Sequence, residues 1–210
     1  MTVHLHKNDL PDGIDFGRSV AVDTETQGLS LVRDKLCLVQ LSAGDGDAHI
    51  VQVDRETYDC PNLKALMANT DVEKIFHFAR FDVAIMRRDL DVDITPVFCT
   101  KIASGLVRTY TDRHGLKDIC RELLGVDLSK QQQSSDWASD VLTEAQLNYA
   151  ASDVLYLHQL KTILSARLIR ENRFDLAKAC FEFLPSRAAL DLSGWDDVDI
   201  FSHNLKRSQS

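Results

Sequence analysis

The sequence lacks the features that mark secreted proteins, proteins with structural zinc sites and membrane proteins. Its five cysteines are odd in number and form no CxxC pair, which argues against a disulfide framework and a zinc site. No apolar run approaches the roughly 20 residues that span a bilayer. The first residues, MTVHLHKNDLPDG, have neither the basic nor the apolar region of a secretory signal. We therefore expect a cytoplasmic protein with reduced thiols and no membrane partner.

Linkers and repeats are also missing. The 4 prolines and 9 glycines of the 210-residue chain are scattered, and no segment is of low complexity. A single hydrophobic core can grow to roughly 250 residues before a chain divides. The sequence therefore predicts one continuous domain.

Basic charge is in deficit, since the formal net charge is -8. Proteins that bind long duplexes build their affinity from many Lys and Arg contacts to phosphates. Any nucleic-acid partner should therefore be short or held locally. Part of the acidity fits carboxylates that bind a divalent cation, whose charge would reverse the local field.

The first half of the sequence predicts a sheet that is followed by alternating helices and strands. Residues 36–43 and 48–53 flank the turn GDGD, and with residues 19–25 they predict an antiparallel meander. The elements expected next are a helix at 62–69, a strand at 74–78, a helix at 80–90, the short strand VFC and a helix at 100–107.

The second half predicts helices. Apolar spacing in HGLKDICRELLG predicts one helix that ends at Gly125. Thr143 and Gln146 form a capping box for a second helix that runs to about residue 171. A third helix is expected to end near Pro185.

The residues after Pro185 are expected to be extended. They carry apolar side chains that need a surface to cover them, namely Leu190, Leu192, Trp195 and Phe201. The chain is thus divided into a domain at 1–185 and a tail at 186–210, which we expect to pack on a neighbouring subunit.

The run VAVDTETQG ends an apolar strand with two carboxylates, Asp23 and Glu25. Residues two apart on a strand point to the same face, so these acids repel each other unless a cation lies between them. A lone DxE is more often a solvated strand end. Haloacid-dehalogenase phosphatases open with a similar strand, but they need an Asp where Glu25 stands, and their lysine and distal acidic motifs are not evident.

The segment KIFHFARFDVAI places Asp82 in the first turn of a predicted helix. An acid at that position can complement the helix dipole and nothing more. His77, Phe78 and Phe81 surround it in the sequence, however, and flat rings beside a metal-binding carboxylate suit base stacking. Core packing is the other explanation for one or two of these rings.

Tyr149 and Asp153 in LNYAASDVLYLHQL are four residues apart and share one face of a helix. The phenol can reach a water bound beside the carboxylate. Taken alone, such a pair is more often a hydrogen bond on a helix surface.

In this order the three segments resemble the Exo I, Exo II and Exo III motifs of the DEDD exonuclease superfamily. The histidine branch of that superfamily carries a His five residues before the last Asp, where this chain has Asn148, so Tyr149 indicates the tyrosine subclass. Within it the chain resembles the RNase D group. Stretches such as CLVQLS, KIFHFARFD and SKQQQSSDW extend the resemblance, over nearly the whole chain, to the nanoRNase C family of bacterial short-oligonucleotide exonucleases.

The resemblance implies an RNase H-like α/β fold with a mixed five-stranded sheet flanked by helices. It implies a 3'-5' exonuclease that releases 5'-mononucleotides with two divalent ions, and hard oxygen ligands favour Mg2+ or Mn2+. Asp23 would bridge both ions, Glu25 and Asp153 would hold the nucleophile-side ion, and Asp82 would act through the other ion or its waters. Tyr149 would orient the attacking water, because a phenol with a pKa near 10 is a poor base.

Further residues are predicted to hold the substrate. Thr24 and Thr26 offer backbone and hydroxyl donors to the terminal ribose, and Leu29 either wedges between the last two bases or packs in the core. His114 is either a phosphate contact or a helix N-terminal residue. The polar stretch SKQQQSSDWAS either holds a substrate phosphate or is a solvated loop. Its candidates are Lys130, Gln132, Ser134 and Trp137.

Charge and resemblance together predict very short single-stranded RNA, including dinucleotides, as the substrate, with DNA left open. The resemblance also implies a homo-oligomer in the form of an octameric ring. One alternative is an exonuclease that acts, like RNase D, on longer RNA or on single-stranded DNA. Another is a catalytically inactive nucleic-acid-binding scaffold, although a scaffold has no chemical reason to keep all five residues.

Overall fold

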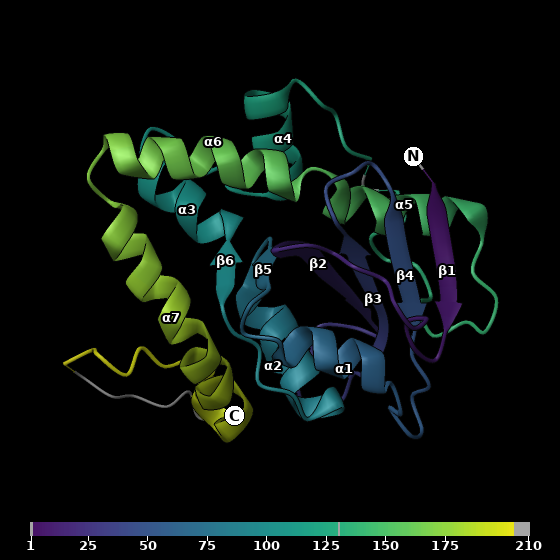
Figure 1. Cartoon of the computed structure of the whole chain (residues 1–210). Coiled ribbons are helices and arrows are strands. Elements are labelled where there is room, and N and C mark those ends of the chain that lie inside the picture. The colour runs from purple at the N-terminus through teal and green to yellow at the C-terminus, as the bar shows by residue number, and fades with distance from the viewer. Residues whose placement is uncertain (1, 130, 204–210) are drawn as a thin grey trace.

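The computed structural model describes residues 2–129 and 131–203 and consists of one sheet flanked by helices (Figure 1). The strands are β1 (Val3–Lys7), β2 (Ser19–Thr26), β3 (Leu36–Ser42), β4 (Ala48–Gln52), β5 (Glu73–Phe76) and β6 (Val97–Cys99). The helices are α1 (Pro61–Ala68), α2 (Ala79–Leu90), α3 (Thr100–Val107), α4 (Leu116–Leu124), α5 (Glu144–Leu155), α6 (Leu157–Arg170) and α7 (Phe174–Leu190), followed by the π-helical turn η1 (Asp191–Trp195).

The sheet has six strands in the order β1-β4-β3-β2-β5-β6. β2, β3 and β4 pair antiparallel, which confirms the predicted meander, and the other three pairs are parallel. The mixed α/β class is confirmed, with one strand more than the five expected. The added strand is β1, whose alternating histidines hid its strand character. His4 and His6 stack on His49 of β4, with ring centroids 4.8 and 5.2 Å apart.

The two faces of the sheet are covered by different helices. α5 packs across β2, β3 and β4 on one face, where Leu38, Ile50, Trp137 and Ala150 form a small apolar cluster. On the opposite face the buried residues of α1 and α2 join the main core. Every residue of β3 is buried, as expected for a central strand.

The predicted helix ends were correct in two places. Gly125 ends α4 with a φ of 70°, and its N–H donates to the carbonyls of Cys120 and Arg121. Thr143 and Gln146 form the predicted capping box at the start of α5. The single helix expected up to residue 171 is wrong, because it breaks at Tyr156 into α5, which covers the sheet, and α6, which packs on α3.

The expected helix end near Pro185 is also wrong. α7 continues through Pro185 to Leu190 and is followed directly by η1, so the start of the predicted extended tail is helical. A proline inside a helix removes one backbone hydrogen bond. Burial of Ala177, Phe181, Leu184 and Ala188 along α7 offsets that loss.

The segment after α7 is tied to α2. Arg80 forms two hydrogen bonds to the Asp191 carboxylate, at 2.6 and 2.8 Å, and a third to the Asp196 carbonyl at 2.6 Å. Arg187 bonds to the same carboxylate at 2.7 Å and to the Val198 carbonyl at 3.0 Å. Residues 191–198 therefore hold the first turn of α2 in place. Among the described residues, no helix is both long and apolar enough to cross a membrane.

Candidate active site

The site begins where β2 extends past its neighbour β5. β5 pairs with β2 only from Ser19 to Ala21, whereas β2 continues to Thr26. Beyond that point Thr24 of β2 contacts Asp82 of α2, the helix that follows β5. Asp23 and Glu25 are on this overhang, directly after the apolar run of Val20, Ala21 and Val22.

Three predicted carboxylates converge there. Asp23 and Glu25 pair with Gln40 and Leu38 of β3, which places them on the sheet face that α5 covers. α5 brings Asp153 over them, and one ligand oxygen from each of the three acids lies within 4.8 Å of the others. This is a carboxylate cluster that could hold a metal ion.

Asp82 approaches from the first turn of α2. Its side chain is 4% exposed, and its Oδ1 accepts a hydrogen bond of 2.6 Å from the Thr24 hydroxyl. It lies outside the group of three, but its charge is close enough to raise the pKa of Asp23, Glu25 and Asp153. All four predicted acids therefore interact electrostatically with one another.

The four acids are partly or fully buried, and their negative charges repel one another. Burial, followed by the charges of Asp82, Asp153 and Glu25, raises the pKa of Asp23 well above its usual value. Burial and the charges of Asp153 and Asp82 raise the pKa of Glu25 to about 9. Burial raises the pKa of Asp82 and of Asp153 to about 7. A divalent cation would relieve this repulsion, and the all-oxygen donor set fits Mg2+ or Mn2+.

Tyr149 lies beside Asp153 and hydrogen-bonds to it. Burial, followed by the charges of Asp153, Glu25 and Asp23, raises the pKa of the phenol above its usual value. The phenol is therefore protonated at neutral pH and acts as a hydrogen-bond donor. The positioning of the attacking water by this phenol stays a prediction.

Trp137 is buried, which does not fit the substrate contact predicted for it. The side chain is 3% exposed and packs on Tyr149 with 5.9 Å between ring centroids. An apolar cluster beneath α5 holds it there. Trp137 supports the tyrosine from within the protein, which the polar residues around it in the sequence did not indicate.

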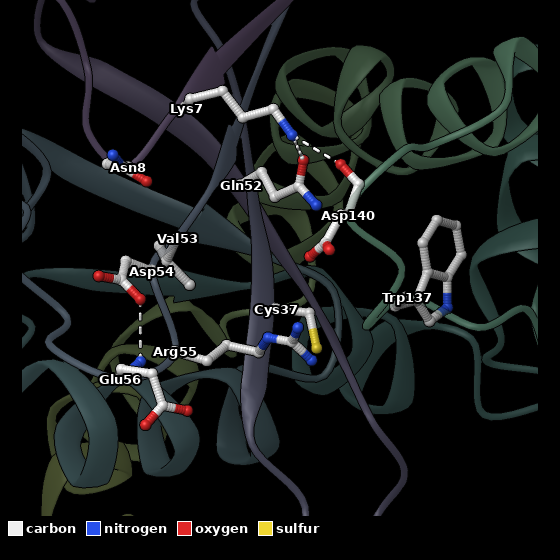
Figure 2. Close-up of a pocket in the computed structure, with 10 residues that line it drawn as sticks. All are labelled: Lys7, Asn8, Cys37, Gln52, Val53, Asp54, Arg55, Glu56, Trp137 and Asp140. Carbon is white, nitrogen blue, oxygen red and sulfur yellow. Dashed lines mark hydrogen bonds between the residues drawn. The ribbon is translucent and has the colours of Figure 1, made fainter.

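The loop that carries Trp137 is fixed to the sheet edge around a pocket of about 290 Å3 (Figure 2). Three side chains each donate to a backbone carbonyl of this loop at 2.8 Å: Lys7 to Asp140, Gln52 to Ser139 and Arg55 to Ala138. Figure 2 shows Lys7 and Gln52 reaching toward Asp140, with Trp137 on the same side. These three hydrogen bonds hold the loop in place, and with it Trp137, which packs on Tyr149.

Within the described part of the polar stretch, Ser129, Gln131 and Gln132 lie near Tyr149. Ser134 is exposed, and the Gln132 amide oxygen accepts a 2.6 Å hydrogen bond from the Ser135 hydroxyl. Gln132 and Tyr149 both line a pocket of about 350 Å3. Lys130 lies outside the described residues.

His77, Phe78 and Phe81 surround the start of α2, and each has different surroundings. Phe78 adopts a left-handed backbone conformation with a φ of 68° and is 44% exposed. Lys101 Nζ lies 3.9 Å from the centroid of its ring. Phe81 is half-buried and packs against the core, so its alternative assignment as a packing residue fits the structure. Phe78 is the most exposed of the three rings, and Lys101 lies over one face of it.

The tautomer of His77 follows from its contacts. The Thr100 hydroxyl donates to the Phe76 carbonyl at 3.1 Å, so it accepts the 2.9 Å hydrogen bond that joins it to His77 Nδ1. Burial, with Lys101 and His114 nearby, lowers the pKa of His77 to about 3. The ring is therefore neutral and carries its proton on Nδ1, which leaves Nε2 as an acceptor.

His114 precedes the N-cap of α4, Gly115, so its predicted position at a helix start fits the structure. Its Nδ1 is 2.9 Å from the Ser104 hydroxyl, which also accepts from Arg108 at 2.9 Å. Its charge lowers the pKa of His77, which places it near the site.

Thr24 and Thr26 differ from their predicted role as hydroxyl donors to a ribose. The Thr24 hydroxyl donates to Asp82, and the Thr26 hydroxyl donates to the Gly28 carbonyl. Both side chains are buried. Strand alternation points them to the face opposite Asp23 and Glu25, a signal already present in the sequence. Leu29 is 86% exposed, so its alternative assignment to the core is wrong.

The sequence reasoning missed two residues beside the site. Lys101 places a cation over Phe78, and nothing in its sequence surroundings distinguishes it. Gln40 is the partner of Asp23 in the ladder and is completely buried. The sequence did mark Gln40 as unusual, because it is a single amide inside the apolar run LCLVQL.

Comparison with known proteins identifies the family. A 3'-5' exonuclease family matches residues 8–169. The chain belongs to this family. A curated relative of the exonuclease, ribonuclease D of Acidiphilium cryptum, is 36% identical over 156 residues, which are 74% of this chain and 39% of that protein. The chain thus spans less than half the length of that relative.

Solved structures similar to the exonuclease support the same assignment. Brucella melitensis NrnC with bound Mg2+ is 54% identical with a TM-score of 0.93, over 97% of this chain and 100% of that one. The same protein bound to pGG is 55% identical with a TM-score of 0.94, again over 97% and 100%. The predicted enzyme class, the resemblance to RNase D and nanoRNase C, and the RNase H-like fold are therefore confirmed.

Proposed function

We propose that this exonuclease hydrolyses very short RNAs, including dinucleotides, from the 3' end and releases 5'-mononucleotides. The observation that carries the proposal is the convergence of Asp23, Glu25 and Asp153 within 4.8 Å, with Asp82 and Tyr149 beside them. The similarity to NrnC bound to pGG supports a short substrate.

The proposed cofactors are two divalent ions, Mg2+ or Mn2+, held by the four carboxylates. Asp23 would bridge the ions, Glu25 and Asp153 would hold the one on the nucleophile side, and Asp82 would serve the other directly or through water. Bound ions of this kind acidify the attacking water and stabilise charge on the phosphate during in-line displacement. The raised pKa values of the acids fit a site that is completed by cations.

The residues of the chain orient the reactants. The protonated Tyr149 phenol would hold the attacking water in line with the phosphate, while Trp137 fixes the phenol from behind. His77 presents an unprotonated Nε2 that can accept a hydrogen bond from a ribose hydroxyl or a water.

Binding would involve the last two nucleotides. The exposed Leu29 would separate their bases, and the exposed ring of Phe78 would stack on one of them. Thr24 and Thr26 would contribute backbone groups alone, since their hydroxyls have other partners. Lys130, Gln132, Ser134 and His114 stay candidates for a phosphate contact.

Three further predictions stay proposals. Residues 1–185 would form the exonuclease domain, and residues 186–210 would contribute to contacts between subunits of an octameric ring. The location would be cytoplasmic. Within the last segment, the part up to Val198 also stabilises α2 through Arg80 and Asp191.

One experiment separates the proposal from its two alternatives. Rates with Mn2+ are measured on RNAs of two to about twenty nucleotides and on DNA of the same lengths. High rates on dinucleotides and low rates on long RNA support the proposal. Higher rates on long RNA or on DNA favour an activity like that of RNase D, and no hydrolysis of any substrate indicates an inactive scaffold.

A further inference from the structure

Gln40 is a buried amide in the centre of the sheet. Its exposed fraction is 0%, and every residue of its strand is buried. Among the described residues, neither its amide nitrogen nor its amide oxygen finds a hydrogen-bond partner. Buried amides are nearly always paired, because desolvation without a partner is unfavourable. An amide enclosed in this way needs a hydrogen-bond partner, and the described residues supply none.

The strand register places this amide beside the carboxylates. Gln40 pairs with Asp23 of β2 on one side and with Ile50 of β4 on the other. Side chains directly opposite each other on antiparallel strands share a face, with Cβ atoms roughly 4.5–5.5 Å apart. α5 covers that face, so the Gln40 amide and the Asp23 carboxylate are enclosed together.

Two of the other carboxylates already have a side-chain donor. The Thr24 hydroxyl donates to Asp82, and the Tyr149 phenol donates to Asp153. For Asp23, the hydrogen bond found among the described residues comes from the backbone of Thr24. Asp23, the acid proposed to bridge both ions, thus has a backbone donor. Directly across the ladder from it lies an amide that finds no partner in the part of the chain that the structure describes.

We propose that Gln40 is a positioning residue for Asp23, and that its amide nitrogen donates to the Asp23 carboxylate in the metal-loaded enzyme. The proposal rests on the two-metal site proposed above. Partners that orient a metal-binding carboxylate in this way tune the affinity for the metal. A neutral amide suits the task because it adds a donor without a positive charge that would compete with the ions.

The first test replaces Gln40 with methionine, which has a similar length and no hydrogen-bonding amide. Mn2+ binding to the metal-free protein is measured by calorimetry without substrate. We expect Gln40→Met to weaken Mn2+ binding by roughly 10–100-fold. The melting temperature of the metal-free variant should be equal to or higher than that of the wild type, because an unpaired polar group is removed.

Ile50→Met is the matched control, because Ile50 lies on the same face, on the other side of Gln40 and away from the acids. Its Mn2+ isotherm should match the wild type. A Gln40→Met isotherm equal to that of a wild type that binds Mn2+ would overturn the role of Gln40 and leave the metal site intact. A wild type that binds no Mn2+ would overturn both proposals.

A second measurement does not depend on the folding of a variant. In wild-type protein with 15N-labelled glutamine, titration with Mg2+ should shift the side-chain NH2 resonances of Gln40 and slow their exchange with water. Resonances and exchange rates of the Gln40 amide that stay the same at saturating Mg2+ would contradict the proposal.

Discussion

The Thr24 hydroxyl donates a 2.6 Å hydrogen bond to the Asp82 carboxylate and so joins the DxE strand to the helix that carries the fourth acid. This bond lowers the pKa of Asp82, whereas burial raises it. A hydrogen bond to a charged group contributes about 1.5–3 kcal/mol. Thr24→Val should therefore reduce kcat about tenfold or more, while Thr24→Ser should retain most of it.

Thr26→Val is the control for that prediction. Thr26 is also buried, and it is on the same face of the same strand, but its hydroxyl bonds to the Gly28 carbonyl instead of an acid. Steady-state rates at saturating Mn2+ compare the three variants. A loss of kcat in Thr26→Val equal to that in Thr24→Val would show that the effect comes from packing of the strand.

The second prediction concerns Tyr149. Tyr149→Phe removes the hydroxyl and keeps the ring that packs on Trp137, so the fold should be retained. We expect kcat to fall by roughly 10²–10⁴-fold, the range for a group that handles or positions a proton in the transition state. Mn2+ binding measured by calorimetry should change little. An unaltered kcat would mean that the Tyr149 and Asp153 pair is structural.

The third prediction is a pH dependence of stability in metal-free protein. The pKa values of Asp82 and Asp153 are raised to about 7 and that of Glu25 to about 9, whereas unfolded carboxyl groups titrate near 4. The folded state therefore holds more protons than the unfolded state, and its free energy of unfolding falls as the pH rises through these values. This stability is fully present below about pH 4.

The effect of the acids on stability is best measured between about pH 6.5 and pH 8. Below pH 6.5 the buried histidines, such as His77, make the free energy of unfolding rise with pH, because burial lowers their pKa. Above pH 8 Lys74 has the same opposing effect, because burial lowers its pKa to about 8. Thermal melts in EDTA should lose stability across this window, and the rise in melting temperature caused by Mg2+ should be larger at pH 8 than at pH 6.5. An Mg2+ effect of equal size at both values would contradict the assignment of the acids as metal ligands.

Much of the site was predictable because its geometry is local. Two acids two apart on a strand, and Tyr149 four residues before Asp153 on a helix, are fixed by the periodicity of their elements. What could not be predicted depends on contacts between distant segments. The sequence around Trp137 is polar, yet the loop folds inward because Lys7, Gln52 and Arg55 hold its backbone.

Helix ends show the same limit. Gly125 and the capping box of Thr143 and Gln146 act within a few residues and were predicted correctly. α7 passes through Pro185 because its apolar face is buried, and the sequence of the helix alone does not contain that information.

The fourth prediction concerns subunit contacts. Deletion of residues 186–210 would also remove Asp191, the partner of Arg80 beside Asp82, so it would disturb the site as well as any interface. Truncation after Val198 avoids this, since Val198 is buried and bonded to Arg187. We expect the shorter chain to keep its melting temperature within a few degrees. Light scattering should show an assembly of fewer subunits than the full-length chain forms. An unchanged number of subunits would show that residues 199–210 are not needed for the interface.

The last prediction concerns substrate length. A chain with a net charge of -8 has little basic surface to follow a long phosphate track, so its binding energy should come from the terminal nucleotides. Stacking of a base on a ring such as Phe78 contributes roughly 1–3 kcal/mol, and burial of the exposed Leu29 side chain between two bases adds about 1.5–3 kcal/mol. Each further phosphate adds repulsion from the negative net charge without adding a base contact, so the value of kcat/KM should be higher for a two-nucleotide RNA than for RNAs of seven or twenty nucleotides. Leu29→Ala should lower kcat/KM on the dinucleotide about tenfold, whereas Val32→Ala, at a position that is 95% exposed in the same loop, should not. Equal values of kcat/KM at all three lengths would reject the preference for short RNA, and an equal effect of both substitutions would reject the wedge.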